Sequence, residues 1–189
     1  MSFFPSLPEN AGVRHILTLN PEAGRALVAF HTAALRNASP LTLAHKELIA
    51  AYVSGLNACQ YCYGVHAQTA QAFGMGKGVL EALLADVDSA DVEERLKPLL
   101  RYARKLTLEP TRMTQEDAQA VFDAGWTEVA LHDAVLTVCL FNFMNRLLEG
   151  HGVKGNPGVF NTRGQALRDD GYEPLLAFLD AAAQAAPRA

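Results

Sequence analysis

The sequence has no excess of positive charge and no long hydrophobic run. It has 16 Lys and Arg against 20 Asp and Glu, a formal net charge of −4. That balance, without a basic cluster, gives no electrostatic case for a nucleic acid or an anionic membrane as partner. The most apolar stretch, residues 130–148, is interrupted by charged and amide side chains, so we do not expect a membrane span. The first twelve residues lack the pattern of a signal peptide, and we expect a cytoplasmic protein.

Cysteine is also scarce, with three residues in 189, so the cysteines cannot all pair within one chain. In the cytoplasm thiols are kept reduced, and a C-x-x-C pair there is more often catalytic or metal-binding than structural. No segment alternates as a strand does. The glycines at 74, 76 and 78 follow no strand and precede no Lys-Ser/Thr pair, which excludes a phosphate loop.

Apolar residues recur with helical period along nearly the whole chain. We predict helices over residues 21–37, 42–56, 57–73, 79–85, 96–106, 114–123, 127–148 and 172–185, a loop over 150–164 and fraying of 186–189. Thr42, Asn57, Thr114 and Thr127 are the expected N-caps. The helical period predicts an all-α fold, a helical bundle. The length of 189 residues, half of them hydrophobic, predicts one domain over 1–189. The helix–glycine–helix order occurs twice and would fit a duplicated helical hairpin.

The reactive side chains concentrate in one stretch, which holds Glu47, Cys59, Cys62 and His66. On a helix, Cys62 and His66 share a face and Cys59 lies one turn before Cys62. We expect the positive helix end at an Asn57 cap, together with His66, to favour the Cys62 thiolate. Glu47 would orient His66 or relay a proton through water or Cys59. Such a pair reduces a peroxide through a sulfenic acid and then a disulfide.

Several nearby polar residues are candidates for the wall of a pocket. Tyr61 is interpreted mainly as a packing residue, with a place in the pocket as the alternative. Asn142 and Arg146, together with Asn145, lie on an apolar helix and need partners if buried. We favour a core network for them over a pocket lining, and Arg146 is one conceivable partner for Glu47.

A zinc site is the main alternative for the cysteines. Cys59, Cys62 and His66 supply three ligands, and Glu47 or Cys139 would have to be the fourth. Structural zinc sites usually combine two separated ligand pairs, and one pair is visible here, so the redox interpretation is preferred. An inert structural pair is the third reading. Cys139 lies in the most apolar helix and is predicted to be a buried free cysteine. The remaining histidines lack ligand-like spacing and are interpreted as structural: His15, His31, His45, His132 and His151.

The order Glu47, C-x-x-C, His66 resembles the signature of the alkylhydroperoxidase D-like, carboxymuconolactone decarboxylase superfamily. The stretch from Leu41 through FNFMNRLLEGHGV, Phe141 to Val153, is similar to its peroxidase-related subgroup. The resemblance covers roughly residues 21–153. It implies an all-helical fold, homo-oligomers such as trimers or hexamers, and peroxidase or peroxiredoxin-like activity without haem or metal.

By this resemblance Cys62 is the peroxidatic cysteine, Cys59 the resolving one, and Glu47 and His66 the proton relay. The reductant would be a lipoyl-type or thioredoxin-type dithiol. One departure is Tyr61, where the founding hydroperoxidase has a second histidine. Tyrosine titrates near ~10 and is a poor base, so a shorter relay is expected. The superfamily also has a decarboxylase branch that acts on a small cyclic acid without the cysteine pair, and this is an alternative function. A non-catalytic helical assembly protein is another.

Overall fold

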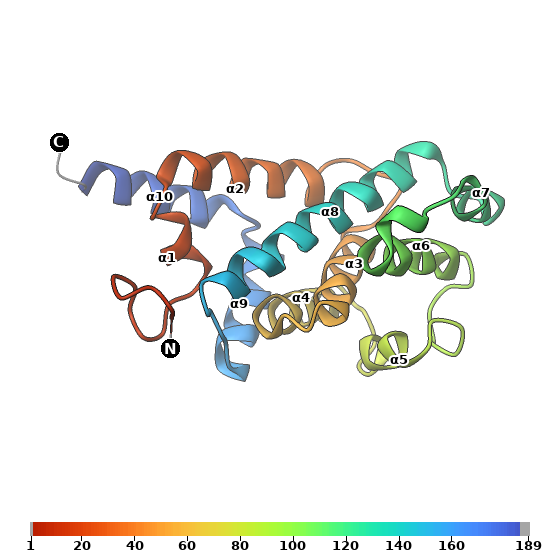
Figure 1. Ribbon diagram of the computed structural model, residues 1–189, viewed down its shortest axis with the longest axis horizontal. Coiled ribbons are helices and arrows are strands. Elements are labelled where there is room, and N and C mark those ends of the chain that lie inside the picture. The colour runs from red at the N-terminus through yellow and green to blue at the C-terminus, as the bar shows by residue number, and fades with distance from the viewer. Residues whose placement is uncertain (1, 186–189) are drawn as a thin grey trace.

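The computed structural model describes residues 2–185, and this part of the chain is helical without a strand (Figure 1). Its elements are α1 (Val13–Leu17), α2 (Pro21–Leu35), α3 (Leu43–Leu56), α4 (Gln60–Ala72), α5 (Val79–Ala85), α6 (Leu96–Leu108), η1 (Pro110–Arg112), α7 (Gln115–Asp123), α8 (Glu128–Gly150), α9 (Pro157–Asp169) and α10 (Glu173–Ala185). The all-α prediction is confirmed. No helix within residues 2–185 is long and apolar enough to cross a membrane. The predicted fraying of 186–189 falls outside the described residues.

Helix α8 crosses the middle of the molecule (Figure 1), packed against α2, α3, α4, α6 and α7. Its inner side is buried along its length, through residues such as Val138, Phe141 and Leu148. One face remains open, where Val129 is 57% and Phe143 53% exposed. Cys139 is exposed as well, so the prediction of a buried Cys139 is wrong. Residues 129, 139 and 143 fall on one side of a helix. Because the residues of this side are apolar too, the sequence did not indicate that it faces outward.

Threonine side chains begin the helices as the sequence predicts. The Thr42 hydroxyl accepts the backbone N–H of His45, and the Thr127 hydroxyl accepts that of Ala130. Thr114 forms a capping box with Asp117, whose carboxylate accepts the Thr114 N–H at 2.8 Å. Three of the four predicted caps are confirmed, because a cap depends on groups only three residues apart.

The fourth cap is wrong. Asn57 ends α3, and Cys59 is the N-cap residue of α4. Between them Ala58 has a left-handed φ of 54°, which turns the chain sharply. The Asn57 amide instead donates hydrogen bonds to two residues of α8, Asn142 at 3.2 Å and Asn145 at 2.9 Å. These hydrogen bonds connect the turn between α3 and α4 to the central helix α8.

The predicted loop over 150–164 is also wrong in its second half, because α9 begins at Pro157. Asn156 caps this helix through its side chain, and proline suits the first helical position. A Cβ on Gly164 would lie 2.6 Å from the Gln68 Cβ, so this glycine lets α9 approach α4. On the α4 side Gly64 does the same for the Phe160 ring. The glycines that favoured a loop instead allow close helix packing.

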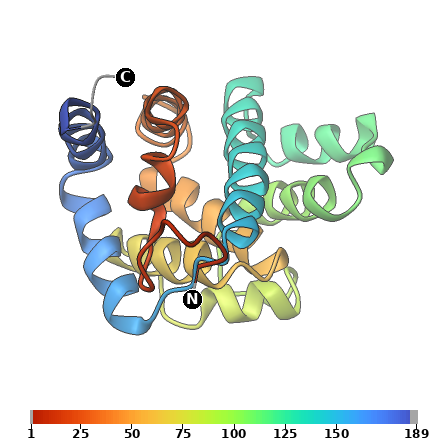
Figure 2. The same cartoon turned by 60° about the vertical axis from the view of Figure 1, so that its left-hand side comes forward.

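Helices from both ends of the chain surround the α3–α4 pair. Helices α1, α2 and α10 lie together at one end of the molecule, and α9 covers α4, whereas α6 and α7 lie at the other end (Figure 2). The repeated helix–glycine–helix order does not extend to packing: α3 packs on α4, but α7 packs mainly on α6. The α3–α4 pair is thus enclosed by segments far away in sequence.

Candidate active site

Glu47 and His66 meet in the core, as the sequence predicts for an interacting pair. The His66 Nδ1 lies 2.6 Å from the Glu47 Oε2, and both side chains are buried. The Phe141 ring packs edge-on against the imidazole, with ring centroids 4.4 Å apart. A carboxylate on Nδ1 fixes the orientation of the ring and leaves Nε2 for a ligand or water.

The second partner of Glu47 is Arg36, which follows the last residue of α2. Its Nη1 lies 2.7 Å from the Glu47 Oε1. Burial alone would raise the pKa of Glu47, but His66 and Arg36 together lower it below its ordinary value. Glu47 is therefore held as a buried carboxylate between the His66 imidazole and the Arg36 guanidinium.

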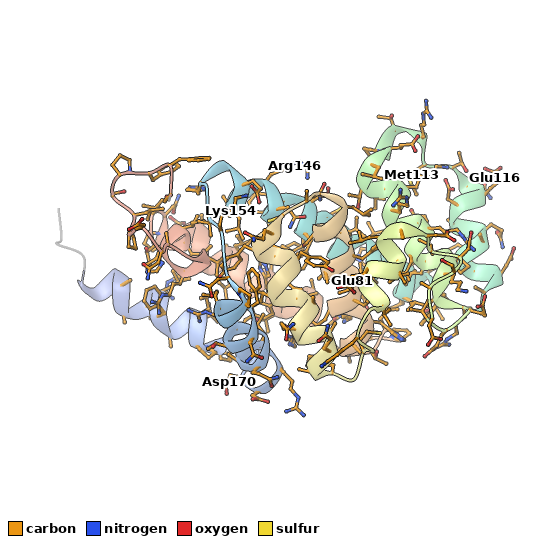
Figure 3. The ribbon with its side chains drawn as sticks, turned by 90° about the horizontal axis from the view of Figure 1, so that it is seen from below. Glu81, Met113, Glu116, Arg146, Lys154 and Asp170 are labelled. Carbon is orange, nitrogen blue, oxygen red and sulfur yellow. The ribbon has the colours of Figure 1, made fainter. Side chains whose placement is uncertain are left out.

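Arg36 is itself held in place by neutral groups. It donates to the backbone carbonyls of Leu35 and Leu167, and its guanidinium lies over the Tyr172 ring, 5.2 Å from the centroid. Arg146, the partner considered from the sequence, is exposed on α8 (Figure 3), where it donates to the Asn142 carbonyl oxygen and Oδ1. It does not pair with Glu47.

The two cysteines of the C-x-x-C pair interact with each other and are unequal. Cys59 stands at the N-cap of α4, and Cys62 lies in the first turn. The hydrogen bond between the two side chains lowers the pKa of Cys59, and the backbone N–H of Cys62 lowers it further against the effect of burial. The same side-chain hydrogen bond, together with burial, raises the pKa of Cys62. The expectation that the helix end and His66 acidify Cys62 thus differs from the structure, in which the helix N-terminus favours charge on Cys59.

Two side chains of α8 also act on the pair. Asn145 forms a hydrogen bond that lowers the pKa of Cys62, and the Glu149 carboxylate raises that of both cysteines. The Asn145 amide donates to the Ser54 hydroxyl at 3.0 Å and its oxygen accepts from Asn57. The core network predicted for Asn142 and Asn145 is present, and it extends to the thiols.

An apolar cavity of about 280 Å³ opens beside Cys62. Cys62 and His66 both line it, whereas Cys59 and Glu47 lie behind its wall. The rest of the lining is largely hydrophobic and comes from α1, α2, α8, α9 and α10, for example Leu17, Val28, Met144, Leu175 and Phe178. A ligand in the cavity would thus meet Cys62 before Cys59.

The other residues singled out from the sequence are dispersed. Tyr61 lines the cavity, and its ring meets that of Phe160 edge-on. Asn142 and Arg146 do not line it. The Cys59, Cys62 and His66 side chains are not gathered as a set of metal ligands anywhere in residues 2–185, and Cys139 lies on the outer face of α8.

The sequence reasoning missed Arg36, His31 and Tyr172. His31 and Tyr172 line the cavity with their rings 5.1 Å apart, tilted against each other. Burial lowers the pKa of His31 to about 4 and raises that of Tyr172. These residues come from α2 and from the start of α10, and no local spacing links them to the cysteines. A positive charge needed by buried Glu47 was the one available signal for Arg36.

Fold and site together define a class of protein: an all-helical bundle with a buried dithiol beside an apolar cavity, whose wall also holds an imidazole bound to a buried carboxylate. Residues 21–105 match the model of the carboxymuconolactone decarboxylase family. None of the curated protein sequences is significantly similar to the chain.

Solved structures show the same fold. A peroxidase-related protein from Ralstonia eutropha JMP134, described as an alkylhydroperoxidase AhpD core, has a TM-score of 0.72, 24% identity and 77% coverage of each chain. A peroxidase-related protein from Silicibacter sp. TM1040 has a TM-score of 0.72, 22% identity and 78% coverage of each chain. A cysteine-to-alanine variant of the debrominase Bmp8, in complex with 2,3,4-tribromopyrrole, has a TM-score of 0.64 and 16% identity over 87% of this chain and 81% of that one. The fold is therefore that of the AhpD-like proteins.

Proposed function

We propose that the protein is a thiol peroxidase that reduces an organic hydroperoxide with Cys62 and Cys59 and is recycled by an external dithiol. The observation that carries this proposal is the position of Cys62: it lines the apolar cavity and interacts with the more acidic Cys59 behind the wall. Nucleophilic attack needs a thiolate on the accessible sulfur and a second thiol within reach to trap the product. In the C-x-x-C pair, Cys59 can accept the Cys62 proton to generate this thiolate, and Cys59 is also the second thiol.

The reaction follows from the inequality of the two cysteines. The Cys62 thiol passes its proton to Cys59, and the Cys62 thiolate attacks the terminal peroxide oxygen. The O–O bond breaks, the alkoxide takes a proton from the Cys59 thiol, and Cys62 becomes a sulfenic acid. The Cys59 thiolate then attacks the Cys62 sulfur, and the leaving hydroxide takes a proton from solvent, through His66, to depart as water while the disulfide forms. The sum is one hydroperoxide and two thiols giving one alcohol, one water and one disulfide.

The disulfide must then be reduced, and a lipoyl-type or thioredoxin-type dithiol is the proposed donor. The dependence on a thiol reductant fits a cytoplasmic protein. Arg36 would have a positioning role, because it holds Glu47 charged so that Glu47 can orient His66. We also propose that the chain works as a homo-oligomer, since the exposed side of α8 carries large apolar side chains.

Cysteine-to-serine variants test the proposal. Cys62→Ser should abolish consumption of cumene hydroperoxide with dihydrolipoamide as reductant, because no thiolate then faces the cavity. Cys59→Ser should consume one equivalent and stop, since nothing resolves the sulfenic acid. Cys139→Ser is the matched control and should keep full turnover, because Cys139 lies on the outer face of α8.

The alternatives give different outcomes in the same experiment. Full peroxide turnover by Cys62→Ser would contradict the proposal, and a thiol-independent activity on a small cyclic acid would favour the decarboxylase branch. Loss of two thiols per chain on adding peroxide, with the mass change of a disulfide, supports the peroxidase. One bound metal ion per chain, with no thiol loss, would favour a structural C-x-x-C pair.

A second candidate is reductive dehalogenation of a small aromatic compound. The apolar cavity beside Cys62 and the fold shared with a debrominase favour it. The dithiol would supply two electrons, so that an aryl bromide and two thiols give the hydrogen-substituted ring, bromide, a proton and a disulfide. Release of bromide from 2,3,4-tribromopyrrole, dependent on Cys62, would support this function.

A further inference from the structure

A second hollow adjoins the apolar cavity at the surface. It has a volume of about 580 Å³ and lies among α1, the start of α9 and the segment between α8 and α9. Arg14, Tyr61 and Arg163 line both hollows and so form the boundary between them. We call the outer hollow the vestibule. A ligand that reaches Cys62 through the vestibule passes the two arginines.

The vestibule is basic in a protein whose net charge is −4. Its lining includes Arg14, His15, Lys154 and Arg163, and no carboxylate. Lys154, on the segment that follows α8 (Figure 3), forms an ion pair with Glu149 of α8. Arg14 and Arg163 have no ion-pair partner among the side chains that the structure describes. The Arg14 guanidinium lies over the Phe178 ring, 5.4 Å from its centroid, and neither guanidinium is neutralised by a carboxylate of the described residues.

The charge of the two arginines affects the pKa values of two neighbouring groups, His15 and Tyr61. The pKa of His15 is lowered by burial, and the charges of Arg14 and Arg163 lower it further. Burial raises the pKa of Tyr61, whereas the charge of Arg163 lowers it in part. The local potential is thus positive where the vestibule meets the cavity. A guanidinium binds a carboxylate through two parallel hydrogen bonds, which makes a carboxylate the matching group.

The inner cavity has the opposite character. Around Cys62 it is walled by apolar side chains, and its volume of about 280 Å³ lies just below the usual range for small-molecule sites, about 300–1,000 Å³. At the wall the buried Tyr172 hydroxyl has no hydrogen-bond partner within residues 2–185, and it is available to donate to an oxygen of a ligand. The cavity suits one ring or a short branched chain with a polar reacting group, not a two-chain lipid.

We propose that the substrate is a small amphipathic hydroperoxide that carries a carboxylate at the end away from the peroxide group. Its apolar body fills the cavity beside Cys62, and Arg14 and Arg163 bind the carboxylate. This inference rests on the proposed peroxidase function. Both arginines lie outside residues 21–105, the range of the family match, so substrate selection is assigned to α1 and α9 and the chemistry to the matched range.

A matched pair of hydroperoxides tests the charge. With the full-length protein, para-carboxylated cumene hydroperoxide should have a kcat/KM about 10-fold above that of cumene hydroperoxide, in keeping with charge-assisted hydrogen bonds. The R14Q/R163Q variant should lose this preference through KM, because its kcat/KM should fall about 10-fold more for the carboxylated peroxide than for the neutral one. The control is R168Q, which replaces an exposed arginine further along α9 and should keep the preference for the carboxylated peroxide. Equal kcat/KM for both peroxides in the wild type, or an equal loss for both in the variant, would overturn the inference.

Binding separates this inference from the peroxidase proposal. By titration calorimetry, para-isopropylbenzoate should bind the wild type, whereas the neutral para-isopropylbenzamide should bind about 10-fold more weakly. R14Q/R163Q should remove that difference. If the wild type consumes neither peroxide, the peroxidase function fails, and selective binding of the benzoate still supports an acid site at the arginines. If neither ligand binds selectively, the acid site is wrong whatever the peroxidase result.

Discussion

At the scale of single residues, buried ionisable groups are the most unusual feature of this protein. Glu47, His66 and Arg36 form a linked set in which each charge has a partner. His31 lies a short distance away in the cavity wall and has no such compensation. Its Nδ1 lies 2.7 Å from the Leu27 carbonyl oxygen, so its one strong contact is with the backbone.

His31 should make the protein sensitive to mild acid. Burial lowers the pKa of His31 to about 4, against an ordinary 6.5. Between these values the unfolded chain binds a proton that the folded protein does not, so stability falls as the pH drops from 6.5 to 4. Above pH 6.5 both states are neutral and the contribution vanishes. The loss at pH 4.5 should be about 2.5 kcal/mol, from 1.36 kcal/mol per pKa unit.

Urea unfolding at pH 7 and pH 4.5 measures this loss. His31→Phe keeps a ring between Phe141 and Tyr172 but cannot titrate, so its free energy of unfolding should fall by roughly 2 kcal/mol less than that of the wild type. His132→Gln alters an exposed histidine and should behave as the wild type does. Identical losses in the wild type and His31→Phe would show that His31 does not carry the effect.

At the scale of elements, the packing of α4 on α9 forms one wall of the cavity beside Cys62. Gly64 and Gly164 face the opposite helix, and each lies against atoms that leave no space for a methyl group. Because α9 supplies Arg163, Ala166 and Leu167 to the cavity wall, its distance from α4 sets the shape of the cavity. Gly164 is also one of the glycines that made the start of α9 resemble a loop in the sequence.

Gly64→Ala should therefore destabilise the protein even though alanine favours helices. Its Cβ would stand 2.4 Å from the Phe160 ring, and the clash should cost about 1–3 kcal/mol. Gly150→Ala is the matched control, because nothing lies within 4 Å of its added Cβ, and it should be neutral or stabilising by up to about 1 kcal/mol. Thermal unfolding compares the two variants, and a Gly64→Ala protein as stable as Gly150→Ala would disprove the tight contact.

At the scale of the whole molecule, the outer face of α8 is the largest apolar feature left open on the central helix. Val129 and Phe143 are both more than half exposed and fall on one side of the helix together with Cys139. The inner side of the same helix forms the core. A helix that is apolar on both sides is expected at a subunit interface.

The double variant Val129→Ser/Phe143→Ser should dissociate the proposed oligomer. Removing two large apolar side chains from an interface core lowers affinity strongly, so light scattering after size-exclusion chromatography should show a shift toward the monomer. Leu19→Ser/Leu108→Ser removes two exposed leucines from other elements and should leave the mass unchanged. A monomeric wild-type protein would refute the interface.

The sequence by itself determined the features that depend on near neighbours along the chain. Helical period gave the all-α fold, threonine caps gave three helix starts, and the spacing of Glu47, Cys59, Cys62 and His66 predicted a shared site. The all-α fold and the three caps are confirmed because caps act over three residues and a helix face repeats every three or four. The shared catalytic role of the four site residues stays a prediction. The family resemblance came from the same spacing.

Only the tertiary structure decided which distant groups meet this site. It placed Arg36 rather than Arg146 on Glu47, turned Cys139 outward, made α9 a helix and brought Arg14 to the cavity. It also gave the lower pKa to Cys59, because Cys59 and not Asn57 stands at the start of α4. Such outcomes depend on the packing of helices that are far apart in sequence, and local spacing carries no record of that packing.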